Sequence, residues 1–308
     1  MSAEWCLRIV TRREAGNVLS LELDDPSGAP LPAFEAGAHI TVETAPKVWR
    51  QYSLYNDPAQ RQRYSIAVLV TRHSRGGGIW LREHARPGML LKARAPQNAF
   101  PLRQPAGPVM LLAGGIGITP LLAMARVCHQ RGVECAFHYT GRPETLEVFT
   151  PLWQTEKLPA LQQHEALPER WPDAVGRDWY LCGSDRFMTH ARQRLLASGA
   201  QTQRIYQEVF TVEQREGDKG FWVEIVGRDA PVWVAPDQTM ADALLAVGCD
   251  VALSCCAGAC GSCGMALAGG VADHRDSYLS EAQRQAQNWI LPCCSRALSD
   301  TLVIDPDG

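Results

Sequence analysis

The sequence lacks the features that would place this chain in a membrane or on nucleic acid. Its apolar runs, such as PVMLLAG at 108–114, are too short to cross a bilayer. The N-terminus, MSAEWCLRIV, has no basic segment followed by a long apolar one, so it does not resemble a secretory signal. The formal net charge is −3, so no overall positive field attracts nucleic acid or anionic lipid. We therefore expect a cytoplasmic protein with no nucleic-acid or membrane partner.

Cysteine, in contrast, is plentiful, with 11 residues. In the expected cytoplasmic location most thiols stay reduced, which argues against a disulfide framework. We expect the scattered cysteines to be small buried hydrophobic residues; they are Cys6, Cys128, Cys135, Cys182 and Cys249. The others gather between 255 and 294, a density that an ordinary core does not need; they are Cys255, Cys256, Cys260, Cys263, Cys293 and Cys294.

The residue pattern divides the chain into three stretches. Residues 1–103 contain short alternating runs between Gly and Pro turns, which predicts a small antiparallel β-barrel. Residues 104–215 alternate strand runs with helical runs, which predicts an α/β domain with a parallel sheet. Residues 220–308 begin with two strand runs at hairpin distance and a short helix capped by Thr239. The charged segment 211–220 is expected to be the linker before this third domain.

The densest cysteine loop has the spacing of an iron–sulfur site. Cys255, Cys260 and Cys263 follow C-x4-C-x2-C, the plant-type [2Fe–2S] spacing. The small residues between them allow the loop to wrap a cluster closely. A fourth thiolate must come from elsewhere, and Cys293 is the candidate, with Cys294 its close competitor. Zinc usually needs a second C-x2-C-like pair, so structural zinc is the weaker alternative.

A flavin site is indicated by RQYSLYN at 50–56. A flavin needs a cation near its phosphate or ribityl chain, a flat wall and a hydroxyl near its reactive nitrogen, which Arg50, Tyr52 and Ser53 supply. Taken alone, such a tetrapeptide is usually only a barrel strand. Its context strengthens the prediction, because IAVLV follows and the loop SRGGG at 74–78 can turn N–H groups and Arg75 toward a phosphate.

A dinucleotide site is indicated by LLAGGIGITP at 111–120. Small residues between a strand and a helix let a pyrophosphate approach the helix N-terminus, although a lone glycine-rich turn is weak evidence. We expect Thr119 to be the N-cap and Pro120 the first helical residue. Arg142 follows a strand and either binds a phosphate or is a solvated loop residue. No basic cluster follows it, which favours NADH over NADPH.

Together, LSCCAGACGSCGMAL and ILPCCSRAL resemble the ferredoxin domain of the phthalate dioxygenase reductase family, which includes the vanillate demethylase reductases. The resemblance extends over the whole chain and implies a β-grasp [2Fe–2S] domain after the FMN-binding barrel and the NAD-binding domain. It implies FMN rather than FAD, and the cluster ligands Cys255, Cys260, Cys263 and Cys293. Cys256 stands where the family usually has Glu, and it and Cys294 are then bystanders.

The resemblance also implies the cofactor contacts. The flavin positions are Arg50, Tyr52, Ser53, Ile66, Ala67, Val68, Arg75, Gly76 and Gly77, and Phe210 lies near the flavin ring. The dinucleotide positions are Gly114, Gly115, Gly117, Thr119, Pro120, Arg142, Cys182, Gly183 and Ser184. Ser184 replaces a family Pro and Asp185 adds an unexpected charge. Glu208 is implied to lie near the nicotinamide, and the candidate catalytic residues are Ser53, Cys182, Glu208 and Phe210.

Electron counting then predicts the function. NADH delivers a hydride, a flavin accepts the pair and releases single electrons, and an iron–sulfur centre passes them outward. The sequence shows no constellation for oxygen activation, so the resemblance implies a Rieske-type oxygenase partner in aromatic catabolism. DHRD at 273–276 is a turn or a docking surface near the cluster. The competing enzyme is an FAD-dependent ferredoxin or flavodoxin-type reductase serving a soluble carrier, which the fused ferredoxin domain makes redundant.

Replacing Cys260 with Ser should abolish the visible absorbance of the iron–sulfur cluster, because a ligand thiolate is lost. Flavin reduction by NADH should survive, whereas reduction of cytochrome c should fall. The measurement is anaerobic absorbance with a cytochrome c assay. Full cytochrome c reduction by the variant would show that the assigned electron path is wrong.

Overall fold

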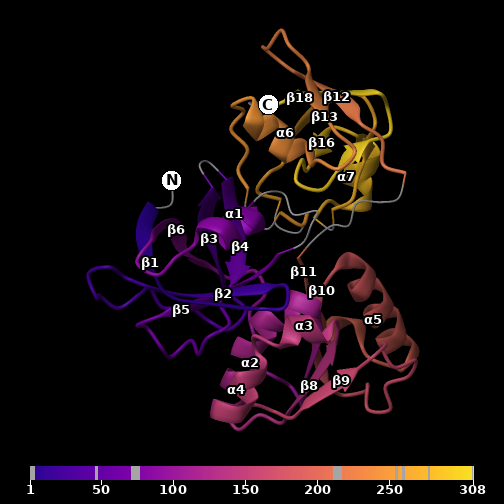
Figure 1. The fold of residues 1–308 in the computed structure, drawn as a ribbon. Helices are drawn as coiled ribbons and strands as arrows, with labels where there is room; N and C mark the ends of the chain where they lie inside the picture. The colour runs from indigo at the N-terminus through magenta and orange to yellow at the C-terminus, as the bar shows by residue number, and fades with distance from the viewer. Residues whose placement is uncertain are drawn as a thin grey trace. The chain divides into compact units, whose positions relative to one another are not determined.

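The computed structural model describes residues 4–45, 48–70, 77–210, 217–253, 256–258, 261–276, 278–306 and 308 (Figure 1). The chain forms two compact units, Met1–Glu208 and Val209–Gly308. The predicted domain boundary at 103/104 lies inside the first unit, and the three predicted domain ranges stay predictions.

The first part of the first unit is an antiparallel barrel of six strands in the order β4-β3-β6-β1-β2-β5. Its strands are β1 (Glu4–Ala15), β2 (Val18–Asp24), β3 (His39–Ala45), β4 (Val48–Ser53), β5 (Tyr64–Leu69) and β6 (Leu90–Gln97). The two terminal strands of this order, β4 and β5, contact each other, as a barrel requires. Aliphatic side chains such as Leu21, Ile40 and Ile66 alternate inward and are fully buried. A helix that the sequence reading missed, α1 (Gly77–His84), packs on β3 and β4.

The second part of the first unit is a parallel sheet in the order β11-β10-β7-β8-β9. The strands are β7 (Val109–Gly114), β8 (Cys135–Thr140), β9 (Leu161–His164), β10 (Asp178–Gly183) and β11 (Ile205–Val209). The helical segments are η1 (Gly115–Gly117), α2 (Ile118–Gln130), α3 (Pro143–Leu146), α4 (Thr150–Thr155), α5 (Asp185–Ala197) and η2 (Thr202–Arg204). The predicted α/β alternation is confirmed, since β10, β7, β8 and β9 pair in parallel.

The start of α2 differs from the prediction by two residues. The helix begins at Ile118, and its cap position is Gly117 rather than Thr119. Thr119 lies inside the first turn, where its hydroxyl donates to the carbonyl of Ile116 at 3.1 Å. The cap preference of threonine was outweighed because the preceding turn, η1, already has helical geometry and runs directly into α2.

The second unit contains a mixed sheet in the order β13-β12-β18-β14-β16 and a small sheet of β15 and β17. Its elements are β12 (Phe221–Ile225), β13 (Val232–Val234), α6 (Met240–Ala246), β14 (Met265–Gly269), β15 (Ala272–Asp273), α7 (Glu281–Ala286), β16 (Trp289–Ile290), β17 (Arg296–Ala297) and β18 (Thr301–Asp305). The predicted hairpin is confirmed by the antiparallel β12 and β13, and the predicted cap by Thr239, which accepts from the N–H of Asp242. Met240 and Leu244 of α6 join the core beneath the sheet.

Among the described residues, no helix has both the length and the apolar character that crossing a bilayer requires.

A buried histidine, His138, pairs with the half-buried His164 on the parallel sheet. Nδ1 of His138 and Nε2 of His164 lie 3.0 Å apart, and the two rings stack with an interplanar angle of 22°. The ring of His138 also meets Trp171 edge to face. Burial and, to a smaller extent, the neighbouring His164 together lower the pKa of His138 to about 4. The pair therefore holds its hydrogen bond in the neutral form.

This pair should make stability fall in mild acid. The unfolded chain binds a proton at His138 near pH 6.5, but the folded chain binds it only near pH 4. The stabilisation is therefore complete above pH 6.5 and is lost as the pH falls toward 4, at roughly 1.4 kcal/mol per pH unit at most. We expect His138→Gln to flatten the pH dependence of urea unfolding between pH 7 and 5. The exposed His129→Gln is the matched control, and equal slopes for both variants would contradict the assignment.

Candidate redox site

The first element of the site is the end of strand β4. Tyr52 packs against the barrel core, and this burial raises the pKa of its hydroxyl, which keeps the side chain uncharged. Ser53 is buried, and the guanidinium of Arg50 donates to the carbonyl of Trp49 at 2.9 Å. The three predicted flavin-motif residues thus lie together on β4.

The N-terminus of α1 lies directly on this strand. A Cβ built on Gly77 would be 2.6 Å from Oγ1 of Thr44 and 3.1 Å from Cγ of Arg50, so only glycine allows this contact. The first N–H groups of a helix have no partner within the helix, and they attract anions. An arginine beside such a terminus fits a phosphate group. Arg75 and Gly76, which were predicted to contact the same phosphate, lie outside the described residues.

The predicted backbone contacts to a flavin lie on β5. Ile66, Ala67 and Val68 are buried, and their strand pairs with β2 on one side. On the other side β5 lies beside β4, and it also contacts the glycine-rich turn η1 of the parallel sheet. An edge of main-chain N–H and C=O groups between these elements fits the polar rim of a flat ring.

Three turns of the parallel sheet meet beside this edge. The strands β7, β8 and β10 end at Gly114, Thr140 and Gly183, and the carboxyl ends of parallel strands form the usual ligand edge. A Cβ on Gly117 would lie 2.1 Å from the carbonyl oxygen of Cys182. A Cβ on Gly141 would lie 3.0 Å from the amide nitrogen of Gly115. The structure therefore brings the predicted turn 114–120 against 182–184.

The departures at Ser184 and Asp185 have a local explanation. Ser184 is the N-cap of α5 and accepts from the amide of Phe187 at 3.4 Å, while Asp185 begins the helix, where a negative charge is favourable. The ring of Phe187 fills the space next to the Cα atoms of Gly114 and Gly183.

Arg142 immediately precedes α3 and is exposed, as a residue that meets an incoming phosphate would be.

Cys182 and Glu208 form an uncharged part of the site. Burial raises the pKa of the Cys182 thiol, and the nearby Glu208 raises it further. Burial also raises the pKa of Glu208 to about 8, and its Oε2 has no hydrogen-bond partner among the described residues. Both groups are mainly protonated at neutral pH.

Phe210 is half-buried and belongs to the second unit, so its predicted contact with the flavin stays a prediction.

In the second unit the structure describes half of the predicted cluster ligands. Cys263 and Cys293 are buried, and the thiol of Cys293 is in hydrogen-bonding contact with those of Cys263 and Cys294. Cys255 and Cys260 lie outside the described residues. In the described part of the chain, no three His, Cys, Asp or Glu side chains gather as a metal site. Two thiols from distant segments meeting in one place fit one half of a four-thiolate set.

Two described glycines close in sequence to the other predicted ligands are tightly enclosed. Gly258 has φ +71°, and a Cβ there would lie 2.6 Å from Sγ of Cys294 and 2.8 Å from Cα of Asp276. Gly261 has φ +74°, and a Cβ there would lie 2.3 Å from the ring of Tyr278. Both positions require glycine, so the loop is built for the close wrapping that a cluster needs.

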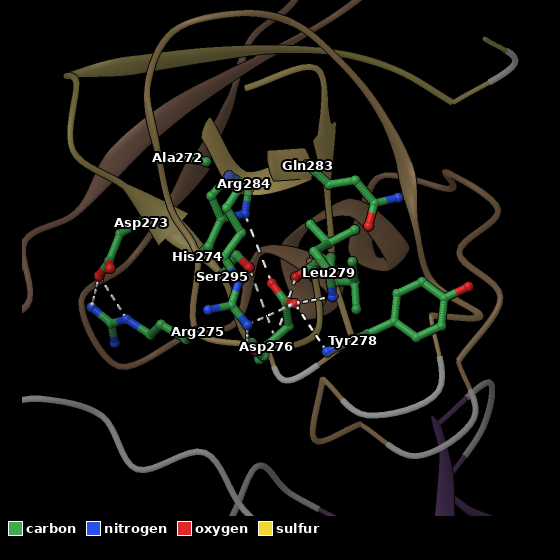
Figure 2. Close-up of polar contacts among 12 residues, drawn as sticks. Ala272, Asp273, His274, Arg275, Asp276, Tyr278, Leu279, Gln283, Arg284 and Ser295 are labelled. Atoms are coloured by element: carbon green, nitrogen blue, oxygen red, sulfur yellow. Dashed lines mark hydrogen bonds and ion pairs between the residues drawn. The ribbon is translucent and has the colours of Figure 1, made fainter. Parts of the chain in front are cut away.

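Behind this loop lies a buried ionic network, drawn in Figure 2. The side chain of Asp276 is fully buried, and its Oδ2 accepts from the amides of Tyr278 at 3.1 Å and Leu279 at 2.7 Å. Nη2 of Arg284 lies 3.7 Å from the same oxygen and donates to the main-chain carbonyl of Asp276. Asp276 therefore fixes the segment that covers the cluster loop.

The interpretation of DHRD as a docking surface is wrong. Arg275 is 6% exposed and forms a bidentate pair with Asp218 at 2.6 and 2.8 Å, and its Nε donates to Asp273 at 2.7 Å. His274 is likewise buried beside Asp276. A short motif of charged residues looks exposed in a sequence, and only the folded chain shows that its charges pair with the distant Asp218. The roles of Asp218 and Arg284 were missed for the same reason.

An antiparallel barrel, a parallel sheet with a glycine-rich turn and a domain with buried thiols are the parts that an electron-transferring oxidoreductase combines. Residues 223–298 match the family model of the 2Fe-2S iron-sulfur cluster binding domain. The chain is 34% identical to a vanillate O-demethylase oxidoreductase of Pseudomonas sp. strain HR199, covering 96% of this chain and 97% of that protein. It is 30% identical to the heme-dependent oxidative N-demethylase beta subunit of Ectopseudomonas mendocina, covering 99% and 100%.

The solved structure of phthalate dioxygenase reductase, described as modular for electron transfer from pyridine nucleotides to [2Fe-2S], matches with a TM-score of 0.79 at 32% identity, covering 98% of both chains. The chain belongs to the phthalate dioxygenase reductase family. It is a flavoprotein oxidoreductase with a [2Fe–2S] domain, and it transfers electrons from a pyridine nucleotide to an oxygenase component. The predicted family, fold class and enzyme class are confirmed.

Gly258→Ala should prevent cluster retention, because its Cβ would collide with the main chain of Asp276 and with Sγ of Cys294. Gly248→Ala is the matched control, since Gly248 has a similar φ of +75° but nothing within 4 Å of a new Cβ. Both variants bear the cost of positive φ, about 1 kcal/mol, but only the first should lose iron. Iron and sulfide analysis of the purified variants measures this. Equal cluster content in both would contradict the enclosed-loop assignment.

Proposed function

We propose that this chain carries electrons from NADH through FMN and a [2Fe–2S] cluster to a Rieske-type oxygenase. The observation that supports this most directly is the contact between β5 of the barrel and the glycine-rich turn η1. That contact puts the strand predicted to hold a flavin beside the turn predicted to hold a dinucleotide. Hydride transfer needs this adjacency, because the two rings must meet without intervening solvent.

The flavin phosphate is assigned to Arg50 and the N-terminus of α1. The ring is assigned to the edge between β4 and β5, with the main chain of Ile66–Val68 on its polar rim. Ser53 is assigned to the reactive nitrogen, where a hydroxyl can donate a hydrogen bond. FMN is proposed rather than FAD on the family resemblance.

The dinucleotide is assigned to the carboxyl edge of the parallel sheet. Gly114, Gly115 and Gly117 let the pyrophosphate approach the turn η1 that leads into α2. Cys182 and Glu208 are assigned to the nicotinamide. Their protonated state leaves the ring in an uncharged surrounding, which suits the neutral ring of NADH. When bound, a flavin accepts a hydride and releases its electrons singly to a one-electron centre.

The cluster is assigned to Cys255, Cys260, Cys263 and Cys293. Cys294 is assigned a structural role, because its thiol donates to the carbonyl of Leu291 and packs on Gly258. Phe210 is assigned to the flavin.

The Rieske class of the partner rests on the family resemblance. A haem-dependent acceptor is the second candidate, because one full-length relative is named as a subunit of a heme-dependent enzyme. An aromatic acid or a similar small molecule is the substrate proposed for the oxygenase. Reduction of purified Rieske and haem oxygenase components, followed at their separate visible bands, distinguishes the two.

Anaerobic titration with NADH should bleach a flavin band and a broader iron–sulfur band together. The expected total is about three electrons per chain, two for the flavin and one for the cluster. NADPH at equal low concentration should act more slowly. A protein that binds no flavin, or one whose flavin NADH does not reduce, would contradict the proposed function. Zinc found in place of iron would indicate the structural alternative.

A further inference from the structure

An arginine of the parallel-sheet half of the first unit is buried against the barrel half. Arg126 lies in α2, and its side chain is only 8% exposed. Its Nε and Nη2 donate to the two carboxylate oxygens of Glu156 at 2.6 and 2.9 Å. Its Nη1 donates to the main-chain carbonyl of Tyr55. A buried guanidinium requires partners of this quality, because an unpaired one is strongly destabilising.

The two segments that Arg126 joins both lead to the redox site. α2 starts directly after the turn η1 and carries Thr119 in its first turn. The helix rises about 10 Å between Thr119 and Arg126. Tyr55 follows Ser53 of the flavin-motif strand by two residues. One side chain therefore ties the helix behind the dinucleotide turn to the chain that leaves the flavin strand.

Neighbouring contacts hold the Tyr55 end of this tie in place. The hydroxyls of Tyr55 and Ser20 share a hydrogen bond of 2.8 Å, and the Tyr55 ring meets Phe149 edge to face. One turn after Arg126, the amide of Gln130 donates to Asp57 at 2.7 Å. The carbonyl that Arg126 contacts is therefore a fixed point of the barrel.

We propose that Arg126 is a positioning residue for hydride transfer, which keeps the dinucleotide turn at its working distance from the flavin strand. This inference rests on the proposed function. In the step concerned, the C4–H bond of NADH breaks, and the hydrogen passes with both bonding electrons to the reactive nitrogen of the flavin, so that NADH becomes NAD⁺ and the flavin is reduced by two electrons. Arg126 is not among the residues assigned to either cofactor, and its hydrogen bonds go to Glu156 and Tyr55, so it acts on the geometry of transfer and not on cofactor binding.

The expected effect of loosening the tie is a slower transfer with nearly normal binding. A misplacement of about 1 Å can cost on the order of 100-fold in rate. We expect Arg126→Leu to lower the limiting rate of flavin reduction at saturating NADH by about 10- to 100-fold. The dissociation constant for NADH should change by less than about threefold, because the dinucleotide contacts remain. Stopped-flow reduction of the flavin-loaded protein measures both quantities.

Arg131→Leu is the matched control, since Arg131 caps the other end of the same helix and is exposed. It should reduce its flavin at the wild-type rate. In Arg126→Leu alone, slower transfer should become rate-limiting, so a deuterium isotope effect on kcat should grow when the transferred hydrogen of NADH is labelled. Equal limiting rates in both variants, or a loss confined to the NADH dissociation constant, would overturn the inference.

Two milder variants keep the test decisive if Arg126→Leu fails to retain flavin. Arg126→Lys preserves a donor for the Tyr55 carbonyl but not the two-point pair with Glu156, and we expect it to recover most of the limiting rate. Glu156→Gln keeps one acceptor and should cost less than about tenfold. A lysine variant that is as unable to hold flavin as the leucine variant would mean that Arg126 serves stability alone.

The proposed function and this inference fail in different ways. Wild-type protein whose flavin is not reduced by NADH would overturn the proposed function. Normal wild-type reduction with an unchanged limiting rate in Arg126→Leu would overturn only the positioning role.

Discussion

Direct contact between one main-chain segment and another, with no side chain between them, is the constraint on which both units depend. In the first unit, Gly117 lies against the carbonyl of Cys182, so the first and last turns of the dinucleotide edge touch. In the second unit, Gly258 lies against Asp276, so the ligand loop touches the segment that covers it. Any side chain at these glycines would push two functional loops apart. The remaining features of the sites assume that these two approaches are kept.

Much of this arrangement could be predicted from the sequence, because it depends on local patterns. The alternation along HITVET and RYSIAVLV, the strand–turn–helix at 111–120 and the C-x4-C-x2-C spacing each record a local geometry in neighbouring residues. The helix α1 could not be predicted, because GGIWLREH starts with glycines and has few residues that favour a helix by propensity. It forms because Leu81 is buried in the barrel core and Gly77 fits against Arg50.

Ion pairs between residues that are far apart in the sequence could not be predicted either. Arg275 and Asp218 are separated by 57 positions, and Arg126 and Glu156 by 30. Charged residues are normally exposed, so nothing local marks these as buried. In the folded chain, each of these arginines joins segments that flank a redox element. Such pairs add little net stability compared with apolar packing, but they hold segments in one register.

The protonation state of the Glu208 carboxyl bears on how readily the oxidised nicotinamide would leave the proposed site. Burial raises its pKa to about 8, so this carboxyl beside Cys182 is mainly protonated near pH 7. In the proposed site, the nicotinamide ring enters uncharged and leaves as a cation. A neutral lining does not attract the cationic oxidised ring, whereas an ionised carboxylate would attract it and slow its release. With Glu208 at the nicotinamide, as proposed, the burial of one acidic side chain would favour product departure and forward turnover, without any contact that holds the substrate more tightly.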